Sequence, residues 1–411
     1  MRRLTVLLAA LLASQGLIPA AGGSDVADAW HRPERPDREV RFATFNASLN
    51  RTNAGELRAD LEAALDGDVD PQLDAVLKII DRNDPDVLLV NEFDTGTDGD
   101  RSTVSMFAEL SRYRYFFTAP SNTGVPSGVD LDNNGTIGGP GDAFGFGFFP
   151  GQFGMAVFSK FPIDTRHART FQHFLWDDMP GAMLPANPDG SQFYSDEELE
   201  VFRLSSKSHW DLPIVIDGRR VVHFLVSHPT PPVFDGPEDR NGTRNFDEIR
   251  FWADYVRPGR ASRYIYDDGG RRGGLRPGAS FVIAGDQNSD PLDGDSVPGA
   301  IQQLLDHPRV NTKVTPDSEG AVEAAELQGG INDTHLSDPR FDTADFGDVA
   351  PGNLRADYVL PSKRLKIGDA GVFWPVSDDP DSELTGVFPF PSSDHRLVWV
   401  DIAARRGRRC W

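Results

Sequence analysis

The chain has 411 residues, of which 39% are hydrophobic, enough for a sizeable core, and its formal net charge is −22. This acidic charge disfavours sequence-independent binding of DNA through a basic face, but it leaves open a phosphate substrate that is bound through a divalent metal. The single cysteine, Cys410, excludes an intramolecular disulfide, and its place beside the chain end makes it a poor candidate for a catalytic thiol.

The first 23 residues have the pattern of a secretory signal. Arg2 and Arg3 precede an apolar run over residues 4–12, and small residues follow around residues 20–23. The apolar run is too short to cross a bilayer, and no later stretch is long and apolar enough to do so. We therefore expect an exported, monomeric protein with a leader over residues 24–39, one domain over residues 40–403 and a basic tail over residues 404–411.

Strands and helices are predicted from the spacing of apolar residues along the rest of the chain. Strands are expected at 40–45, 86–90, 113–118, 152–160, 209–216, 220–227, 281–284, 355–360 and within 391–402. Helices are expected at 71–82, 102–110, 196–202, 245–256 and 298–306. Asp70 is a plausible cap for the first helix, with Pro71 in its first turn. Residues 119–149 and 171–206 are predicted to be long loop inserts, and residues 317–350 an irregular acidic segment.

Polar side chains stand at or beside the ends of six of the predicted strands. They are Asn46, Glu92, His228, Asp286 with Asn288, Asp357, and Asp394 with His395. Each has a structural explanation when taken singly, as a turn residue, a solvated charge or a packed histidine. The ends of strands are also where an α/β sheet places its binding and catalytic side chains. One shared site explains all six positions together, whereas the alternative needs a separate structural reason for each.

The ordered series of motifs resembles the endonuclease/exonuclease/phosphatase superfamily, which has the deoxyribonuclease I-like fold. The resemblance extends from about residue 41 to residue 402. The matching motifs are FNAS at 45–48, VNEFD at 90–94, GMAVFSKFP at 154–162, SHPTPP at 227–232, GDQNSDP at 285–291, DYVLPS at 357–362 and SSDHRLV at 392–398. It implies a four-layered α/β/β/α sandwich with long loop inserts, and hydrolysis of a phosphate ester with a hard divalent cation.

The resemblance also implies roles for these residues. Carboxylate and amide oxygens suit Mg²⁺ or Mn²⁺. Glu92 would be the principal metal ligand, helped by Asn46 and by Asp394 or the Asp286–Asn288 pair. Five residues would act on the substrate or its phosphate: His228, Asp286, Asn288, Asp357 and His395.

Within this set, Asp286 would orient or deprotonate the attacking water. His395, held by Asp357, would contact the phosphate, because an Asp–His pair fixes the tautomer and favours imidazolium. His228 would be a second phosphate contact or the acid for the leaving group, and Asn288 would donate to a phosphate oxygen. No glutamate stands near residues 152–155 to orient His228, where some members have one; only Gln152 is offered there.

The sequence motifs indicate two further candidate sites less specifically. Lys207 and His209 are candidate phosphate contacts, although a place on the hairpin surface explains them equally well. Asp130, Asp132 and Asn134 stand at positions 1, 3 and 5 of a calcium loop, but position 12 is Gly141 and the nearest carboxylate is Asp142. A glycine-rich turn explains this segment as well as a structural calcium site.

The sequence thus favours a secreted, metal-dependent phosphoesterase, with the substrate left open among nucleic acid, nucleotide, sugar or inositol phosphate, and lipid headgroup. A secreted nuclease is one alternative, which the acidic charge does not favour. A non-catalytic, calcium-stabilised extracellular binding protein on the same fold is the other. A serine hydrolase is not indicated, because the chain has no G-x-S-x-G motif.

Overall fold

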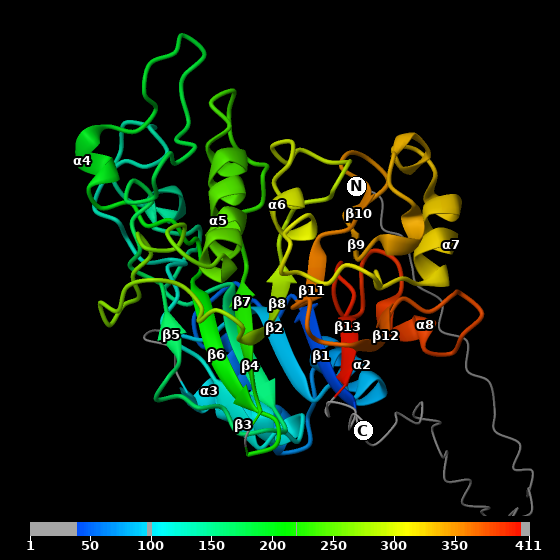
Figure 1. The fold of residues 1–411 in the computed structure, drawn as a ribbon. Helices are drawn as coiled ribbons and strands as arrows, with labels where there is room; N and C mark the ends of the chain where they lie inside the picture. Colours follow the sequence, from blue (N-terminus) through cyan, green and yellow to red (C-terminus); the bar gives the residue numbers. More distant parts are fainter. Residues whose placement is uncertain (1–38, 97–100, 219, 404–411) are drawn as a thin grey trace, which may run out of the picture. The chain divides into compact units, whose positions relative to one another are not determined.

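The computed structural model describes residues 39–403, except 97–100 and 219 (Figure 1). The predicted secretory signal, nearly all of the leader, the basic tail and Cys410 lie outside the described residues. Within the described part, no helix has the length and apolarity needed to cross a membrane.

Most strands belong to two sheets. The first has the strand order β12 (Ile367–Val372), β13 (Val398–Ala403), β1 (Glu39–Asn46), β2 (Val87–Phe93), β4 (Gly154–Ser159) and β3 (Tyr115–Phe117). The second has the order β11 (Asp357–Pro361), β8 (Ser280–Asp286), β7 (Val221–Ser227), β6 (His209–Val215) and β5 (Arg169–Thr170). Each sheet contains one parallel pair, β1 with β2 in the first and β7 with β8 in the second. The two strands of each pair therefore end at the same rim of their sheet.

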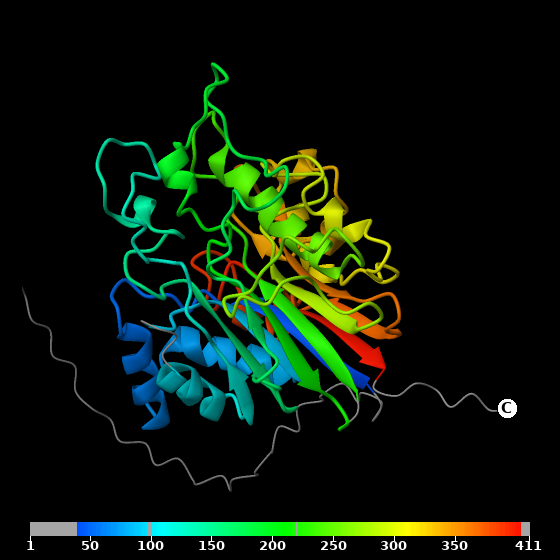
Figure 2. The ribbon, with the colours of Figure 1, turned by 60° about the vertical axis from the view of Figure 1, so that its left-hand side comes forward.

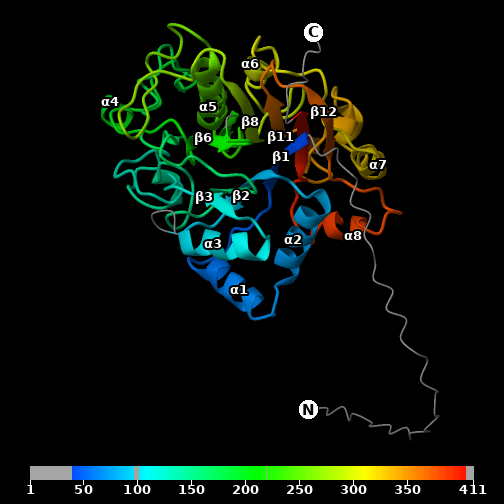
Figure 3. The same cartoon turned by 60° about the horizontal axis from the view of Figure 1, so that its bottom comes forward.

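The described residues form eight α-helices. They are α1 (Glu56–Leu65), α2 (Pro71–Asn83), α3 (Arg101–Leu110), α4 (Asp196–Leu199), α5 (Arg240–Val256), α6 (Gln302–Leu305), α7 (Glu319–Gln328) and α8 (Ser382–Thr385). Figure 3 shows α1, α2 and α3 together on the side of the first sheet, with α5 and α6 on the side of the second. In Figure 2 the blue and cyan helices and the green and yellow helices lie on opposite sides of the strands.

Alternation along the central strands divides the core into three layers. Val40 and Phe42 of β1 pack between the two sheets, whereas Ala43 and Phe45 pack against the helices α1–α3. In β8, Val282 and Ala284 face the first sheet, while Phe281 and Ile283 pack on α5 and α6. A strand that is apolar on both faces requires cover on both, and burying each large side chain contributes about 1.5–3 kcal/mol. The architecture is therefore the predicted four-layered α/β/β/α sandwich.

Local signals account for the predicted elements that the structure contains. Asp70 caps α2 by accepting hydrogen bonds from the backbone N–H groups of Gln72 and Leu73, and Pro71 occupies the first turn. The strands β6 and β7 form the expected hairpin.

Other boundaries differ from the prediction. β8 continues through Gly285 to Asp286 instead of stopping at Ala284, because β11 pairs with it as far as Asp286. The segment predicted to be irregular contains α7, and the helix predicted at 298–306 shortens to α6. The prediction omitted α1 and β12. The helix α5 begins five residues earlier than expected, at Arg240.

Candidate active site

Three side chains from the predicted strand ends, those of Asn46, His228 and His395, meet around the carboxylate of Asp286. Its Oδ2 atom accepts a hydrogen bond from Asn46 Nδ2 at 3.1 Å and lies 3.3 Å from His228 Nε2 and 3.7 Å from His395 Nε2. Asn46 ends β1 in the first sheet, whereas Asp286 ends β8 in the second, so this contact joins the two sheets at one rim. Asp286, His228 and His395 are all buried.

A β-bulge in β2 presents Glu92 at this rim. In the pairing of β2 with β4, Asn91 lies opposite Met155 and Phe93 lies opposite Gly154, so Glu92 is the extra residue. Its φ of 55° lies in the left-handed region, which is uncommon for a non-glycine residue and recurs at functional sites. Asn50 Nδ2 donates to Glu92 Oε2 at 2.9 Å, and the side chain is half-buried. The bulge explains how a residue inside a buried strand reaches the site.

The loop after β8 depends on a close approach of two backbones. Gly285 has a φ of 145°, and a Cβ atom there would lie 1.9 Å from the carbonyl oxygen of Ser227. Only glycine fits at this position. Asp286 Oδ1 then accepts from the backbone N–H of Asn288 at 2.8 Å, and Asn288 Nδ2 donates to the carbonyl of Pro229 at 3.1 Å. Asn288, with a φ of 49°, is thereby fixed beside the site.

His395 lies between two carboxylates. Its Nδ1 atom is 2.8 Å from Asp357 Oδ2, which also accepts from Thr343 Oγ1 at 2.9 Å. Burial would lower the pKa of His395, but the charges of Asp357 and Asp286 outweigh it and hold the pKa well above its ordinary value. Burial raises the pKa of Asp357 to about 6, although the interaction with His395 opposes the rise.

Asp286 behaves oppositely to Asp357. Burial would raise its pKa, but His395, His228 and the Asn46 amide hold the pKa of this carboxyl well below its usual range. A carboxylate of such low basicity is better suited to orienting a water molecule than to removing its proton.

Lys207 and His228 are coupled electrostatically. Burial lowers the pKa of the Lys207 ammonium group, while the carboxylates of Glu248, Glu92 and Asp286 oppose the shift. Burial also lowers the pKa of His228, and the charge of Lys207 lowers it further. The buried Lys207 thus carries its charge into the same electrostatic environment as Glu92, Asp286 and His228. The position is compatible with the predicted phosphate contact.

One short loop, residues 46–50, contacts the other two predicted metal ligands as well as carrying Asn46. Ser48 donates its backbone N–H to Asn46 Oδ1 at 3.3 Å and its hydroxyl to Asp394 Oδ1 at 3.3 Å, while Asn50 holds Glu92. All three candidates thus present oxygen donors around residues 46–50, which is the chemistry that Mg²⁺ or Mn²⁺ prefers. The donor set fits a hard divalent cation.

A second group, formed by Asp286, Asp357 and His395, also brings ligand-type atoms within 4.8 Å of one another. A metal-bound imidazole nitrogen must be unprotonated, whereas the two carboxylates favour the imidazolium form of His395. The imidazolium form of His395 therefore weighs against metal binding by this group and is suited to contact with a phosphate.

Several residues that the sequence did not single out hold this site in place. Glu248 of α5 is buried and accepts from the backbone N–H groups of Ser206 at 2.7 Å and Thr230 at 2.6 Å. It thereby fixes the segments that carry Lys207 and His228. In the sequence, Glu248 is one polar residue among others in the predicted helix, and no pattern distinguishes it. Its burial and its two bonds to the backbone reveal that it fixes these segments.

The neighbouring Asn245 and the distant Arg396 have similar effects. Asn245 Nδ2 donates to the carbonyls of Thr230 and Gln287 at 2.8 and 2.9 Å, which ties the loops after β7 and β8 together. The guanidinium of Arg396 donates to the Ser393 carbonyl at 2.7 Å and braces the loop of Asp394 and His395.

His209 is buried in the core of the second sheet. Its Nδ1 atom bonds with Ser205 Oγ at 2.6 Å, and its Nε2 atom bonds with the carbonyl of Glu248 at 2.9 Å. Because a carbonyl only accepts, Nε2 carries the proton and Nδ1 accepts from the serine. Burial lowers the pKa of His209 to about 4. Both ring nitrogens are occupied, so the structure gives no support to the predicted phosphate contact of His209, and we leave it out of the site.

The predicted calcium loop is compact. Carboxylate oxygens of Asp130, Asp132 and Asp142 lie within 4.8 Å of one another. Asp130 accepts from the backbone N–H groups of Asn134 and Gly135, and Asp142 accepts from those of Leu131 and Gly138. These bonds are those of an Asx-rich turn, so calcium binding stays a prediction.

Comparison with known proteins agrees with the order of the motifs. The model of the Endonuclease/Exonuclease/phosphatase family matches residues 43–395. The chain belongs to this family. Its members are phosphoesterases and nucleases, so a phosphoesterase-type hydrolase is the activity class that membership indicates. A search of curated protein sequences gives no significant match.

Solved structures that resemble the chain show low sequence identity to it. An endonuclease/exonuclease/phosphatase from Beutenbergia cavernae DSM 12333 is 16% identical, with 89% of this chain and 72% of that one covered and a TM-score of 0.47. A family protein from Leptotrichia buccalis C-1013-b is 13% identical, with 88% and 99% covered and a TM-score of 0.44. Beta toxin from Staphylococcus aureus is 13% identical, with the same coverage and a TM-score of 0.43. None of them decides the substrate.

Proposed function

We propose that the chain is an exported phosphoesterase that hydrolyses a phosphate ester by attack of water, with Mg²⁺ or Mn²⁺ as its cofactor. The observation that carries the proposal is the meeting of Asn46, His228 and His395 at one oxygen of Asp286. Two imidazoles and an amide donor around a carboxylate, with Glu92 presented nearby on a bulge, form an arrangement suited to orienting water against a phosphoryl group.

Glu92, Asn46 and Asp394 would hold the cation. When bound, it supplies Lewis-acid stabilisation of the charge that develops on the phosphoryl oxygens. This assignment is supported by the all-oxygen donor set and by the short loop that fixes its members.

The remaining side chains act on the water and the phosphate. Asp286 orients the water, whose oxygen forms the new bond to phosphorus as the bond to the leaving oxygen breaks, and the water releases one proton to solvent. His395, positioned by Asp357, donates to a phosphoryl oxygen or to the leaving group, which takes up one proton. Asn288 and Lys207 contact the phosphoryl oxygens. His228 donates a hydrogen bond as a neutral imidazole and does not protonate the leaving group, because burial and the charge of Lys207 lower its pKa.

Export and calcium binding belong to the same proposal. Export rests on the signal pattern of residues 1–23 and is tested by fractionating cells that express the full chain. Calcium at Asp130, Asp132 and Asp142 would stiffen one of the two long inserts. The acidic charge of −22 weighs against a nuclease acting on long nucleic acids, although it does not bear on small phosphate esters.

The test uses the purified protein with bis(p-nitrophenyl) phosphate and with p-nitrophenyl phosphate. We expect release of p-nitrophenolate with Mg²⁺ or Mn²⁺ and its loss after chelation. Glu92→Gln, Asp286→Asn and His395→Ala should each lower kcat/KM by about 100-fold or more, which is the usual contribution of such groups. Matched controls are Glu323→Gln and His167→Ala, which change side chains whose contacts lie elsewhere on the surface.

Full activity in any of the three site variants would overturn the assignment. A folded protein that hydrolyses neither substrate with any divalent metal would favour the non-catalytic binding protein instead.

A further inference from the structure

A pocket with a volume of about 630 Å³ opens beside the candidate active site. Asn288 and Asp394 belong to both the site and the lining of the pocket. The ring of Phe346, which also lines it, packs edge-on against His395 with ring centroids 5.2 Å apart. A group bonded to a phosphate at the site would therefore extend into this pocket.

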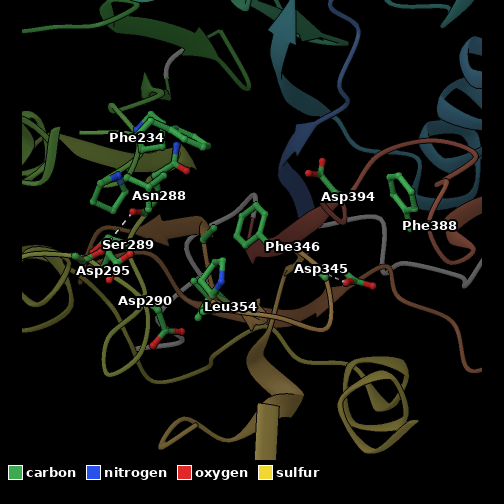
Figure 4. A pocket seen from close by; sticks show the side chains of 18 of the residues that line it. Phe234, Asn288, Ser289, Asp290, Asp295, Asp345, Phe346, Leu354, Phe388 and Asp394 are labelled. Atoms are coloured by element: carbon green, nitrogen blue, oxygen red, sulfur yellow. Dashed lines mark hydrogen bonds between the residues drawn. The ribbon is translucent and has the colours of Figure 1, made fainter. Parts of the chain in front are cut away.

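The walls of the pocket are apolar and partly aromatic. Phe234 and Phe388 are 86% and 83% exposed, an unusual exposure for such large apolar side chains. Prolines, Val233, Leu354, two alanines and two further phenylalanines make up the rest of the apolar lining. In the view of Figure 4, the ring of Phe346 stands between the side that carries Phe234 and Asn288 and the side that carries Asp394 and Phe388. The faces of several phenylalanines are thus available to a ligand.

The polar lining has one sign of charge. Four aspartates contribute to it, namely Asp290, Asp295, Asp345 and Asp394, and none of the described residues that line the pocket is Lys, Arg or His. Arg396, which lies 3.9 Å from Asp345 behind the wall, offsets one of these charges. Asp290 accepts from the backbone N–H groups of Leu292 and Arg355, which fix its carboxylate in the lining of the pocket.

These walls select against a polyanion and in favour of a cation. A second phosphate in the pocket would meet carboxylates and none of the basic side chains that could bind it among the described lining residues, which costs free energy. An alkylammonium group would be attracted by the carboxylates and by the aromatic faces, with which it can form cation–π contacts.

We propose that the pocket binds an alkylammonium group carried by the phosphate ester that the active site hydrolyses. This inference rests on the proposed function and names its substrate class. It disfavours nucleic acids, nucleoside polyphosphates and inositol polyphosphates.

The decisive experiment compares two soluble substrates of the same shape. In p-nitrophenyl phosphorylcholine the pocket group is a trimethylammonium, and in p-nitrophenyl 3,3-dimethylbutyl phosphate a carbon replaces the nitrogen. In both, water bonds to phosphorus, the phosphorus–aryl oxygen bond breaks, and p-nitrophenolate leaves. We expect kcat/KM to be at least tenfold higher for the choline ester. Equal values for the two esters would overturn the inference.

Variants locate the effect in the pocket. Phe234→Ala, Phe388→Ala and Asp295→Asn should each reduce the preference for the choline ester while leaving hydrolysis of bis(p-nitrophenyl) phosphate within about threefold. Phe148→Ala is the control, because Phe148 is 68% exposed and does not line the pocket. An unchanged preference in all three pocket variants would place the cation elsewhere and refute the assignment.

Binding without turnover separates this inference from the proposed function. Calorimetric titration with choline and with 3,3-dimethylbutanol should give tighter binding of choline, lost in Phe388→Ala. If no ester is hydrolysed, the proposed function fails and this titration still decides the pocket. If bis(p-nitrophenyl) phosphate is hydrolysed and choline does not bind, only the pocket assignment fails. If choline does bind, rates of hydrolysis of glycerophosphocholine and of phosphatidylcholine vesicles distinguish a soluble ester from a lipid headgroup as the substrate.

Discussion

Asp357→Asn tests whether the charge behind His395 is needed for activity. Asp357 Oδ2 accepts from His395 and from Thr343, and Oδ1 is buried without a hydrogen-bond partner among the described residues. An asparagine oxygen can accept both bonds, and its amide group can occupy the place of Oδ1. The substitution therefore removes the negative charge while keeping the shape.

The expected loss follows from the strength of this ion pair. Exchanging a charge-assisted hydrogen bond for a neutral one costs about 1–1.5 kcal/mol, whereas two unit charges about 4 Å apart interact by about 4 kcal/mol at an effective dielectric constant of 20. At 1.36 kcal/mol per tenfold change, kcat/KM should fall by between about tenfold and about a thousandfold.

The assay is steady-state hydrolysis of bis(p-nitrophenyl) phosphate across pH 5 to 9. Asp357 raises the pKa of His395, so losing its charge should move the alkaline limb of the profile to lower pH. Asp211→Asn is the matched control, because Asp211 pairs with His223 Nδ1 at 2.6 Å in a buried network of the hairpin and α5. A folded Asp357→Asn protein within threefold of wild-type activity, or an equal loss in Asp211→Asn, would refute the reasoning.

Three further predictions concern the metal, the core and the calcium loop. Glu92→Gln should raise the Mg²⁺ concentration needed for half-maximal activity by tenfold or more, measured by metal titration, and an unchanged requirement would place the ion elsewhere. Burial of neutral His209, with a pKa of about 4 in the folded protein against 6.5 when unfolded, stabilises the fold fully above pH 6.5, and this contribution is lost as pH falls. Between pH 7.5 and 5 the wild type should therefore lose about 2 kcal/mol more unfolding free energy than His209→Asn in urea titrations; parallel losses would contradict the assigned neutral state. Calcium at about 100 times its dissociation constant should stabilise the protein by about 2.7 kcal/mol and raise its melting temperature, but not that of Asp130→Asn. An unchanged wild-type melting temperature would count against the loop site.

Much of the fold was predictable from local patterns in the sequence. The two-sided apolar runs at β1, β2 and β8 require cover on both faces, and the cap at Asp70 marks the start of α2. The order of the motifs was enough to identify the family, because the motifs follow the strands of the two sheets in sequence, and at some positions the backbone also imposes the residue type. Glycine at 285 is an example, since the carbonyl of Ser227 excludes any Cβ atom there.

Only the tertiary structure decided how these ends combine into a site. The contact between Asn46 and Asp286 joins two sheets and spans 240 positions in sequence, so no local pattern carries it. Glu248 became visible through burial alone, and His209 lost its assigned role because both ring nitrogens are engaged in the core. The pocket likewise is lined by residues from four segments, 231–234, 288–296, 345–356 and 388–394. Their aspartates come together only when the chain folds. Sequence determines which groups stand at strand ends, whereas distances between them depend on how the two sheets pack.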